Sequence, residues 1–261
     1  MNEQGRIQRM FQEGRNIVGT HIRSQDPFMS EMLAKIGFDI LWIENEHAGL
    51  DKYTTMLHIM AAQAGGAAAI VRVPWNDPVL VKPILEMGTD GIVFPMVSTA
   101  DEARRAVAAC CYPPRGVRGF GPLRANEYGL IGKDEYLKKA DRQLFKLIQI
   151  EDIRGVENIE EIASVEGVDG LIVGQFDLTG TMEMLGEINH PKTLACIRKV
   201  FEAGHRHGIP CGMSSTPDPE QVRVWRELGA DFIFSSTEYE WVKLAAEPAL
   251  RAIRGTKETE Q

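Results

Sequence analysis

Two pairs of polar residues with the same spacing stand at the ends of apolar runs in this sequence. Gln149 and Glu151 close the run LFKLIQIE, and Gln175 and Asp177 follow the run GLIVG. Side chains two positions apart in a strand point to the same face, so each pair is expected to share one face. Carboxylates at neighbouring strand ends can bind one divalent ion and leave positions for water and substrate. Glu151 and Asp177 are therefore candidate ligands of Mg²⁺ or Mn²⁺.

A histidine and an arginine at two earlier runs could supply a base and a fixed positive charge. Of six histidines, only His47 combines the end of a run with acidic neighbours, Glu44 and Glu46. Arg72 lies within the apolar run AIVRV, where its charge needs an anionic partner. That partner is either a substrate oxygen that gains negative charge, or one of those two glutamates in a structural ion pair. His21, on the first run, is the second candidate base.

The elements that must position these residues follow one repeated pattern, a short β-branched run and then an amphipathic segment. Eight such units within 261 residues predict a single-domain α/β protein, a (β/α)8 TIM barrel. A doubly wound open sheet is less favoured, because no GxGxxG follows the first run. Barrel enzymes carry their sites at the carboxyl ends of the strands, where the residues above stand. The expected strands are 17–22, 39–44, 69–73, 91–97, 144–151, 170–174, 210–213 and 231–234.

The connection over 113–143 is too long for an ordinary link between a helix and a strand. It is either a surface excursion with a short helix, KDEYLKKAD, or a lid or subunit contact. In the second interpretation, Arg115, Arg118 and Arg124 are available to an anion.

Composition limits the partners and the compartment. The chain has 29 Lys and Arg against 37 Asp and Glu, a formal net charge of −8. This excess of acid argues against a nucleic-acid partner and a polybasic membrane anchor. Neither an apolar signal segment nor a run of 18 apolar residues is present, so we expect neither secretion nor a membrane span. The 4 cysteines have no disulfide or metal spacing and suit a reducing cytoplasm.

Taken in order, several segments resemble the HpcH/HpaI aldolase family, the metal-dependent class II pyruvate aldolases. The segments are WIENEHAGLD, VRVPWNDPVLVKPILEMG, YPPRGVRGFG, LIQIED and VEGVDGLIVGQFDLTGTMEMLG. The resemblance runs from about Ile17 to Ala252 and is specific in combination. It implies a (β/α)8 barrel, a divalent cofactor (Mg²⁺, Mn²⁺ or Co²⁺) and a homo-oligomer, usually a hexamer with swapped C-terminal helices. The apolar final segment WVKLAAEPALRAI is the expected assembly element.

The resemblance also assigns roles residue by residue. Glu151 and Asp177 match the metal ligands. Gln149 and the backbone at Phe176, next to Asp177, match substrate contacts. This half of the expected site therefore holds the metal and the 2-oxo acid.

The other half of the expected site carries the proton transfer. His47 matches the general base and Arg72 the group that stabilises the transition state. Glu86 falls where the family has an acid that raises the basicity of the histidine, often across a subunit interface.

The sequence departs from the family pattern near the mouth of the expected barrel, where the carboxyl ends of the strands open to solvent. Glu44 and Asn45 stand where Asp-Gly is common, Glu86 replaces the usual Asp, and Gln175-Phe176 replaces Pro-Ala or Pro-Ser. If Asn45 shares the inward face with His47, the mouth is narrower and more polar than in relatives. That would favour small or hydroxylated aldehydes.

Together with these residues, the resemblance implies an aldolase that cleaves or forms 4-hydroxy-2-oxo acids through a pyruvate enolate, releasing pyruvate and an aldehyde. No lysine stands at an inward strand end for a Schiff base, since Lys146 has the outward parity of Ile148. One alternative is a related metal-enolate lyase acting on a CoA thioester or oxaloacetate. Another is a non-catalytic barrel that binds a carboxylate as a sensor. The sequence does not name the aldehyde half of the substrate.

Overall fold

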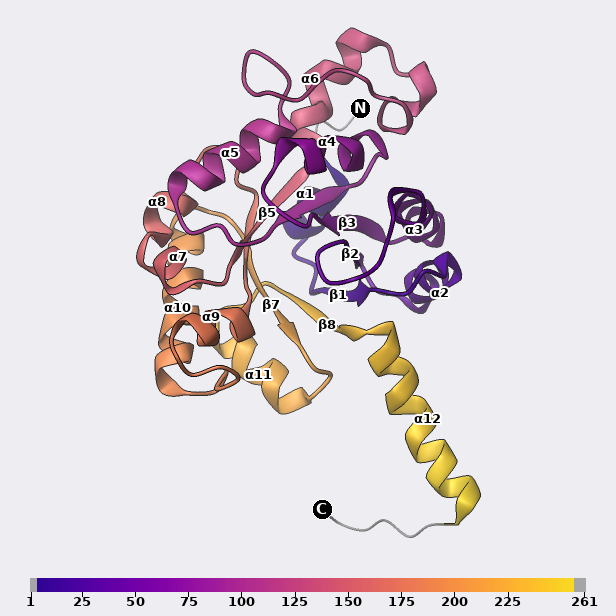
Figure 1. The fold of residues 1–261 in the computed structure, drawn as a ribbon, viewed down its shortest axis with the longest axis vertical. Helices are drawn as coiled ribbons and strands as arrows, with labels where there is room; N and C mark the ends of the chain where they lie inside the picture. The colour runs from indigo at the N-terminus through magenta and orange to yellow at the C-terminus, as the bar shows by residue number, and fades with distance from the viewer. Residues whose placement is uncertain (1–3, 256–261) are drawn as a thin grey trace.

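Eight parallel strands close into a barrel in the computed structural model, which describes residues 4–255 (Figure 1). Each strand pairs with the next one along the chain, and the last pairs with the first. The predicted single-domain (β/α)8 barrel is confirmed. The strands are β1 (Ile17–Ile22), β2 (Ile40–Glu44), β3 (Ala68–Arg72), β4 (Gly91–Phe94), β5 (Phe145–Ile150), β6 (Gly170–Val173), β7 (Cys211–Ser215) and β8 (Phe232–Thr237).

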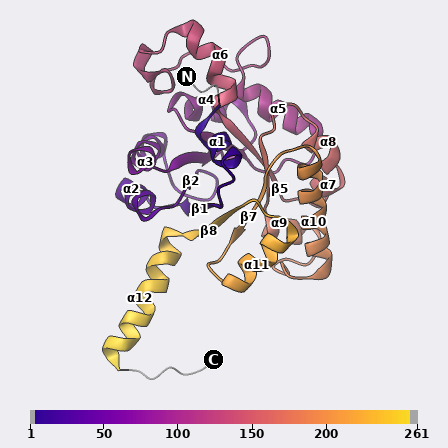
Figure 2. The same cartoon turned by 180° about the vertical axis from the view of Figure 1, so that it is seen from behind.

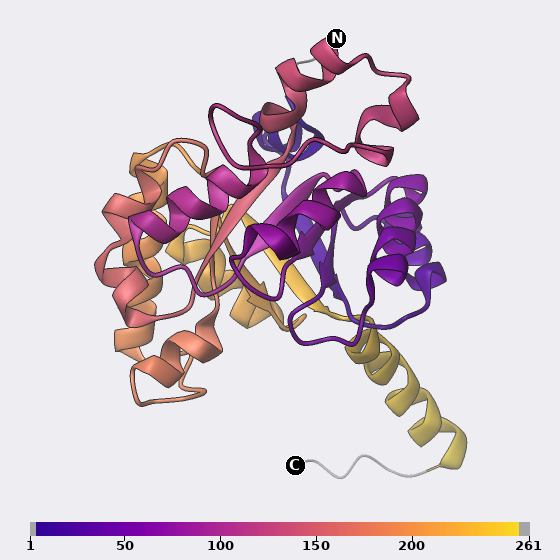
Figure 3. The same cartoon turned by 45° about the horizontal axis from the view of Figure 1, so that its top comes forward.

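Helices surround the barrel on its outer face (Figures 1 and 3). α1 differs, because it covers one end of the barrel and inserts Ile7 and Met10 among the interior side chains (Figure 2). The helices are α1 (Arg6–Gln12), α2 (Pro27–Ile36), α3 (Lys52–Gly65), α4 (Pro78–Glu86), α5 (Ala100–Cys110), η1 (Arg124–Gly129), α6 (Lys133–Gln143), α7 (Ile153–Glu157), α8 (Ile159–Ala163), α9 (Gln175–Thr181), α10 (Pro191–Arg206), α11 (Pro219–Leu228) and α12 (Glu238–Arg254).

Alternation along the strands divides the apolar side chains into an inner and an outer layer. Ile70 and Leu147 belong to the cluster inside the barrel, whereas Val71, Ile148 and Ile150 pack outward against the helices. Polar residues with the inner parity at the carboxyl ends of β3 and β5 must therefore face the barrel mouth. The parity prediction is confirmed on both strands.

Four aspartates secure the opposite end of the barrel. Each one immediately precedes an even-numbered strand and exchanges two hydrogen bonds with a residue at the start of the preceding strand. Its carboxylate accepts that residue's amide at 2.7–3.0 Å, and its own amide donates to that residue's carbonyl at 2.7–3.0 Å. The pairs are Asp39 with Val18, Asp90 with Ala69, Asp169 with Lys146, and Asp231 with Cys211. These contacts fix the amino ends of the strands.

Two segments depart from the compact barrel. The connection over 113–143 forms η1 and α6, so the predicted short helix is present. α12 extends away from the barrel (Figures 1 and 2), and Glu238 is its only buried residue. Near its start, Trp241 Nε1 donates to Thr20 Oγ1 at 3.0 Å. Within residues 4–255, no helix combines the length and apolar character needed to cross a membrane.

Candidate active site

A cavity of about 540 Å³ opens at the carboxyl ends of the strands. Its position matches the place where barrel enzymes build their sites. Most of the residues predicted from the sequence line it, namely His47, Arg72, Gln149, Phe176 and Asp177, together with the second candidate base His21.

Arg72 holds a network of acidic and amide groups at one side of this cavity. Its Nε donates to Glu44 Oε2 at 2.9 Å, and its Nη1 lies 2.8 Å from Glu46 Oε2. The same Nη1 reaches Gln149 Oε1 at 3.4 Å, and the guanidinium carbon lies 5.4 Å from the Trp42 ring centre. The structural ion pair that the sequence left open is therefore present. Arg72 also lines the cavity, so it is placed to meet a substrate oxygen as well.

Glu44 fixes the backbone of the segment that follows β2 through hydrogen bonds. Its Oε1 accepts the amide of Glu46 at 2.7 Å and that of His47 at 3.1 Å. Burial by itself raises the pKa of Glu44, but the Arg72 guanidinium and these amides outweigh it and lower the pKa. Glu44 is thus an ionised anchor for the backbone that carries the candidate base.

His47 presents its ring to solvent at the cavity wall. Its side chain is 57% exposed, and Nε2 lies 3.8 Å from Glu46 Oε2. An imidazole placed this way can exchange protons with a bound ligand or with water.

Glu151 is buried against Gln149 and is not itself among the residues that line the cavity. Its Oε1 accepts the Met96 amide at 2.7 Å, and its Oε2 accepts from Gln149 Nε2. Met96 has a φ of 56°, a left-handed conformation that is unusual for a residue with a side chain. A Cβ on Gly174 would lie 2.6 Å from Glu151 Oε2, so this position needs glycine.

The electrostatics around Glu151 reflect burial and neighbouring acids. Burial raises its pKa to about 7, the Met96 amide opposes the shift, and Glu46 and Asp177 add to it. A carboxylate favours the protonated form where other negative charge is close and water is scarce. The donor set, Glu151 and Asp177, offers only oxygen atoms, as hard divalent cations such as Mg²⁺ require. The residues present therefore fit the predicted metal.

The structure corrects the route by which Asp177 reaches the site. The sequence placed Gln175 and Asp177 on the end of a strand, but β6 stops at Val173 and both residues lie in the first turn of α9. Gln175 is buried and donates from Nε2 to the carbonyl of Ser214 at 3.0 Å. Asp177 nevertheless lines the cavity, because α9 begins immediately after the strand.

Asn45 does not narrow the mouth as expected. Its Oδ1 accepts from Thr55 Oγ1 of α3 at 3.1 Å, so the side chain turns outward and not to the face of His47. The premise of the predicted preference for small aldehydes is therefore wrong. The backbone leaves the strand after Glu44, and strict alternation no longer applies there.

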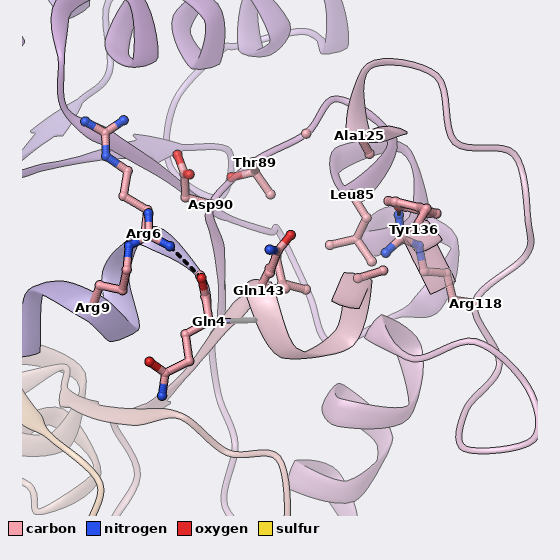
Figure 4. Close-up of a pocket in the computed structure, with 14 residues that line it drawn as sticks. Gln4, Arg6, Arg9, Leu85, Thr89, Asp90, Arg118, Ala125, Tyr136 and Gln143 are labelled. Carbon is pink, nitrogen blue, oxygen red and sulfur yellow. Dashed lines mark hydrogen bonds between the residues drawn. The ribbon is translucent and has the colours of Figure 1, made fainter. Parts of the chain in front are cut away.

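Glu86 lies at the other end of the barrel in this chain. It ends α4 and pairs with Arg118 at 3.2 Å, which in turn contacts Tyr136 Oη at 3.0 Å. Arg118 and Tyr136 line a separate cavity of about 350 Å³ beside α1, where Arg9 donates to the carbonyl of Gln4 (Figure 4). Among residues 4–255, no hydrogen bond or ion pair joins Glu86 to His47, so its role across a subunit interface stays a prediction.

Sequence reasoning treated Glu44 and Glu46 as acidic neighbours of His47 and as possible partners of Arg72, but it missed that Glu44 holds the following backbone and that the Met96 amide holds Glu151. The acidic run after the second strand was the available signal for the glutamates. A backbone amide leaves no such signal, because any residue type supplies one.

The geometry agrees with what the chain resembles among known proteins. The family model for HpcH/HpaI aldolase/citrate lyase matches residues 18–239. The chain belongs to this family. As a member of it, the protein is an enzyme of the aldolase and lyase class.

Individual relatives support the assignment. The chain is 38% identical over 209 residues, 80% of both proteins, to the 5-keto-4-deoxy-D-glucarate aldolase of Citrobacter koseri. A family protein of Burkholderia cenocepacia is 33% identical with a TM-score of 0.88, covering 95% of this chain and 98% of that one. The HpcH/HpaI aldolase of Desulfitobacterium hafniense is 26% identical with a TM-score of 0.90, covering 98% and 99%.

Proposed function

We propose that this enzyme is a divalent-metal-dependent aldolase that cleaves or forms 4-hydroxy-2-oxo acids, with pyruvate and an aldehyde as the other side of the reaction. One observation carries the proposal. Asp177 and Gln149 line the same cavity as Arg72 and His47. Gln149 in turn donates a hydrogen bond to Glu151. A pair of oxygen ligands, a fixed cation and an exposed base are the groups that enolate formation needs.

The acids and the arginine act on the 2-oxo acid half of the substrate. Glu151 and Asp177 would hold the cation, which supplies Lewis-acid charge beside the keto and carboxylate oxygens when it is bound. Arg72 lines the cavity and stabilises negative charge on the keto oxygen as the carbon–carbon bond breaks. Gln149 keeps Glu151 oriented and contacts Arg72, so it couples the two groups.

His47 acts on the other half. It takes the proton of the 4-hydroxyl during cleavage, directly or through a water molecule, and returns it during condensation. The bond between C3 and C4 then breaks, its electron pair remains on the pyruvate unit as the enolate, and the aldehyde departs. A proton from water then adds to C3 and gives pyruvate. No lysine is among the residues that line the cavity, which agrees with a reaction without a Schiff base.

The 5-keto-4-deoxy-D-glucarate named for the Citrobacter koseri relative belongs to this substrate class. Pyruvate release from it and from a panel of 4-hydroxy-2-oxo acids is measured by coupling to lactate dehydrogenase. We expect turnover with Mg²⁺, Mn²⁺ or Co²⁺, loss with EDTA and recovery when metal is restored. Exchange of the pyruvate methyl protons in D₂O tests enolate formation without any aldehyde. Absence of both pyruvate release and exchange with every metal would refute the proposal.

A further inference from the structure

The four aspartates at the amino ends of the strands hold the backbone in the same way, but their side chains meet different partners. Three of them also contact a side chain that offers only N–H donors. These pairs are Asp39 with Arg15, Asp90 with Gln63, and Asp169 with Lys146. The fourth aspartate, Asp231, instead has a histidine and a cysteine beside it. This end of the barrel lies opposite the active site.

Asp231 brings these two residues together through its carboxylate. His205 Nε2, near the end of α10, lies 2.8 Å from Asp231 Oδ2. The same oxygen accepts the amide of Cys211, the first residue of β7, at 2.7 Å. A ring nitrogen of His205, Cys211 Sγ and a carboxylate oxygen of Asp231 all lie within 4.8 Å of one another. We call these three residues the amino-end triad.

The second carboxylate oxygen of Asp231 is available to a ligand. No hydrogen bond or ion pair of this Oδ1 is recorded within residues 4–255. Arg226 is close enough for its charge to act on the carboxylate, but its guanidinium contacts the carbonyl of Ala230 at 2.7 Å and Asn16 Oδ1. The side chains of His205 and Asp231 are 43% and 39% exposed, so an ion reaches them from solvent.

Cys211 supplies a sulfur atom from a buried position. Its Sγ lies 3.8 Å from the carbonyl oxygen of Phe201 and 3.7 Å from that of Ile209, so the thiol makes only weak hydrogen bonds. A Cβ on Gly204 would clash with this sulfur, so α10 needs glycine there. Burial and the charge of Asp231 raise the pKa of the thiol, which therefore stays protonated unless a cation replaces the proton.

The donor types of the amino-end triad indicate which ion suits it. Thiolate sulfur and imidazole nitrogen favour Zn²⁺ and Co²⁺, whereas Mg²⁺ prefers oxygen. Ligands of one tetrahedral ion lie about 3.5 Å apart, so the exposed side chains of His205 and Asp231 need to move by about 1 Å. The active-site acids Glu151 and Asp177 offer only oxygen. The two places in the barrel therefore differ in the ion that each prefers.

We propose that His205, Cys211 and Asp231 form a second metal site, which binds one Zn²⁺ or Co²⁺ ion at the amino end of the barrel and leaves a coordination position for water. The thiol proton goes to solvent, and the imidazole binds through Nε2 with its proton on Nδ1. The bound ion links α10, β7 and the residue before β8, and so stabilises the folded state. This inference does not depend on the proposed aldolase function.

Cobalt absorption distinguishes this second site from the active site. A cobalt–thiolate bond absorbs in the near ultraviolet, whereas a cobalt ion held only by oxygen lacks this band. Co²⁺ is added to the full chain after EDTA treatment and removal of the chelator. We expect the band to saturate at one sulfur-bound ion per chain. Asp177→Asn should keep the band, because this variant retains all three proposed ligands.

Two variants and two matched controls test the ligands. Cys211→Ser should lose the band, because it removes the sulfur and nearly keeps the size of the side chain. His205→Gln should weaken Co²⁺ binding by about tenfold or more, and it changes a partly exposed side chain. Cys196→Ser and His207→Gln, in α10 and at its end, should keep both the band and the affinity.

Thermal unfolding tests the stabilisation with Zn²⁺ itself. The measurement uses Asp177→Asn, so that zinc in the active site contributes less. Zn²⁺ should raise the melting temperature of this protein, because it binds the folded chain. The rise should disappear when His205→Gln is added and persist when His207→Gln is added. An equal rise in both double variants would contradict the proposed ligand set.

The cobalt experiment also states what overturns the proposal. Absence of the band in the native protein does so, and so does a band that persists in Cys211→Ser. Equal Co²⁺ affinity in the native and His205→Gln proteins does the same, and this comparison decides if Cys211→Ser does not fold. In each case, His205 and Asp231 form only a surface ion pair. The aldolase function is tested separately, by pyruvate release with Mg²⁺.

Discussion

Arg72 and Glu44 are register partners at the carboxyl ends of β3 and β2, and the arginine Nε donates to the glutamate Oε2 at 2.9 Å. Both side chains are buried, at 8% and 0% exposure. A buried charge without a partner is costly, so each residue depends on the other. Arg72 also lines the active-site cavity. Its substitution therefore changes both stability and chemistry, and a test must separate the two.

Arg72→Ala should reduce turnover by ~10²–10³, the effect of removing one donor to a developing oxyanion. It should also lower the free energy of unfolding by about 3–5 kcal/mol, because Glu44 is left unpaired. Arg72→Lys keeps the charge but loses the planar fork that contacts two oxygens. We expect its melting temperature near the native value and its kcat still low. A folded Arg72→Lys enzyme with native kcat would contradict the catalytic role.

Asp177→Asn should remove both metal binding and activity. The substitution keeps the shape of the side chain but leaves Glu151 as the one carboxylate ligand. Metal content after dialysis, measured by plasma mass spectrometry, should fall together with kcat. Asp101→Asn, at an exposed carboxylate of α5, is the control and should change neither. Retention of metal and activity in Asp177→Asn would show that the site is assigned incorrectly.

Asn45→Gly should leave the preference among aldehydes unchanged, because the Asn45 side chain bonds to Thr55 and does not line the cavity. The loss of that hydrogen bond should destabilise the fold by about 1 kcal/mol. Urea unfolding and kcat/KM for three aldehydes of different size check the two statements. A broadened range of aldehydes would instead support the inward orientation expected from the sequence.

His21 should make the fold less stable in mild acid. Burial lowers its pKa to about 3, with Glu44 opposing the shift and Arg72 and Arg23 adding to it. The unfolded chain binds a proton on this imidazole below about pH 6.5 and the folded chain does not, so stability falls as the pH drops from about 6.5 toward 3. His21→Gln should flatten this part of the curve of urea midpoint against pH. An equal slope in both proteins would exclude this histidine as the cause.

α12 should mediate assembly. The helix leaves the barrel with Val242, Leu244, Leu250 and Ile253 exposed, an apolar surface that a monomer would leave in water (Figure 1). Sedimentation velocity at micromolar concentration should show a closed oligomer, the hexamer that the family resemblance implies. Ile253→Glu should shift it toward smaller species with unchanged circular dichroism. A native monomer would contradict the prediction and remove the proposed cross-subunit role of Glu86.

The sequence by itself determined the barrel and the inward side chains of β3 and β5. Strand alternation has a period of two residues, so Arg72 and Gln149 were assigned to the mouth by their own apolar neighbours. The same local pattern correctly turned Lys146 away, where it pairs with Asp169. These features depend on contacts between residues close in the chain or on the burial of one face.

The tertiary structure decided what happens where the strands end. Asp177 reaches the site from a helix, Asn45 turns to α3, and the Met96 amide holds Glu151. The alternation of side chains between the two faces ends with the last strand residue. Beyond it, the conformation is determined by hydrogen bonds to partners 10 to 55 positions away in the chain. Barrel closure likewise places β1 beside β8. Residues more than 200 positions apart, such as Arg23 and Ser236, then line one cavity.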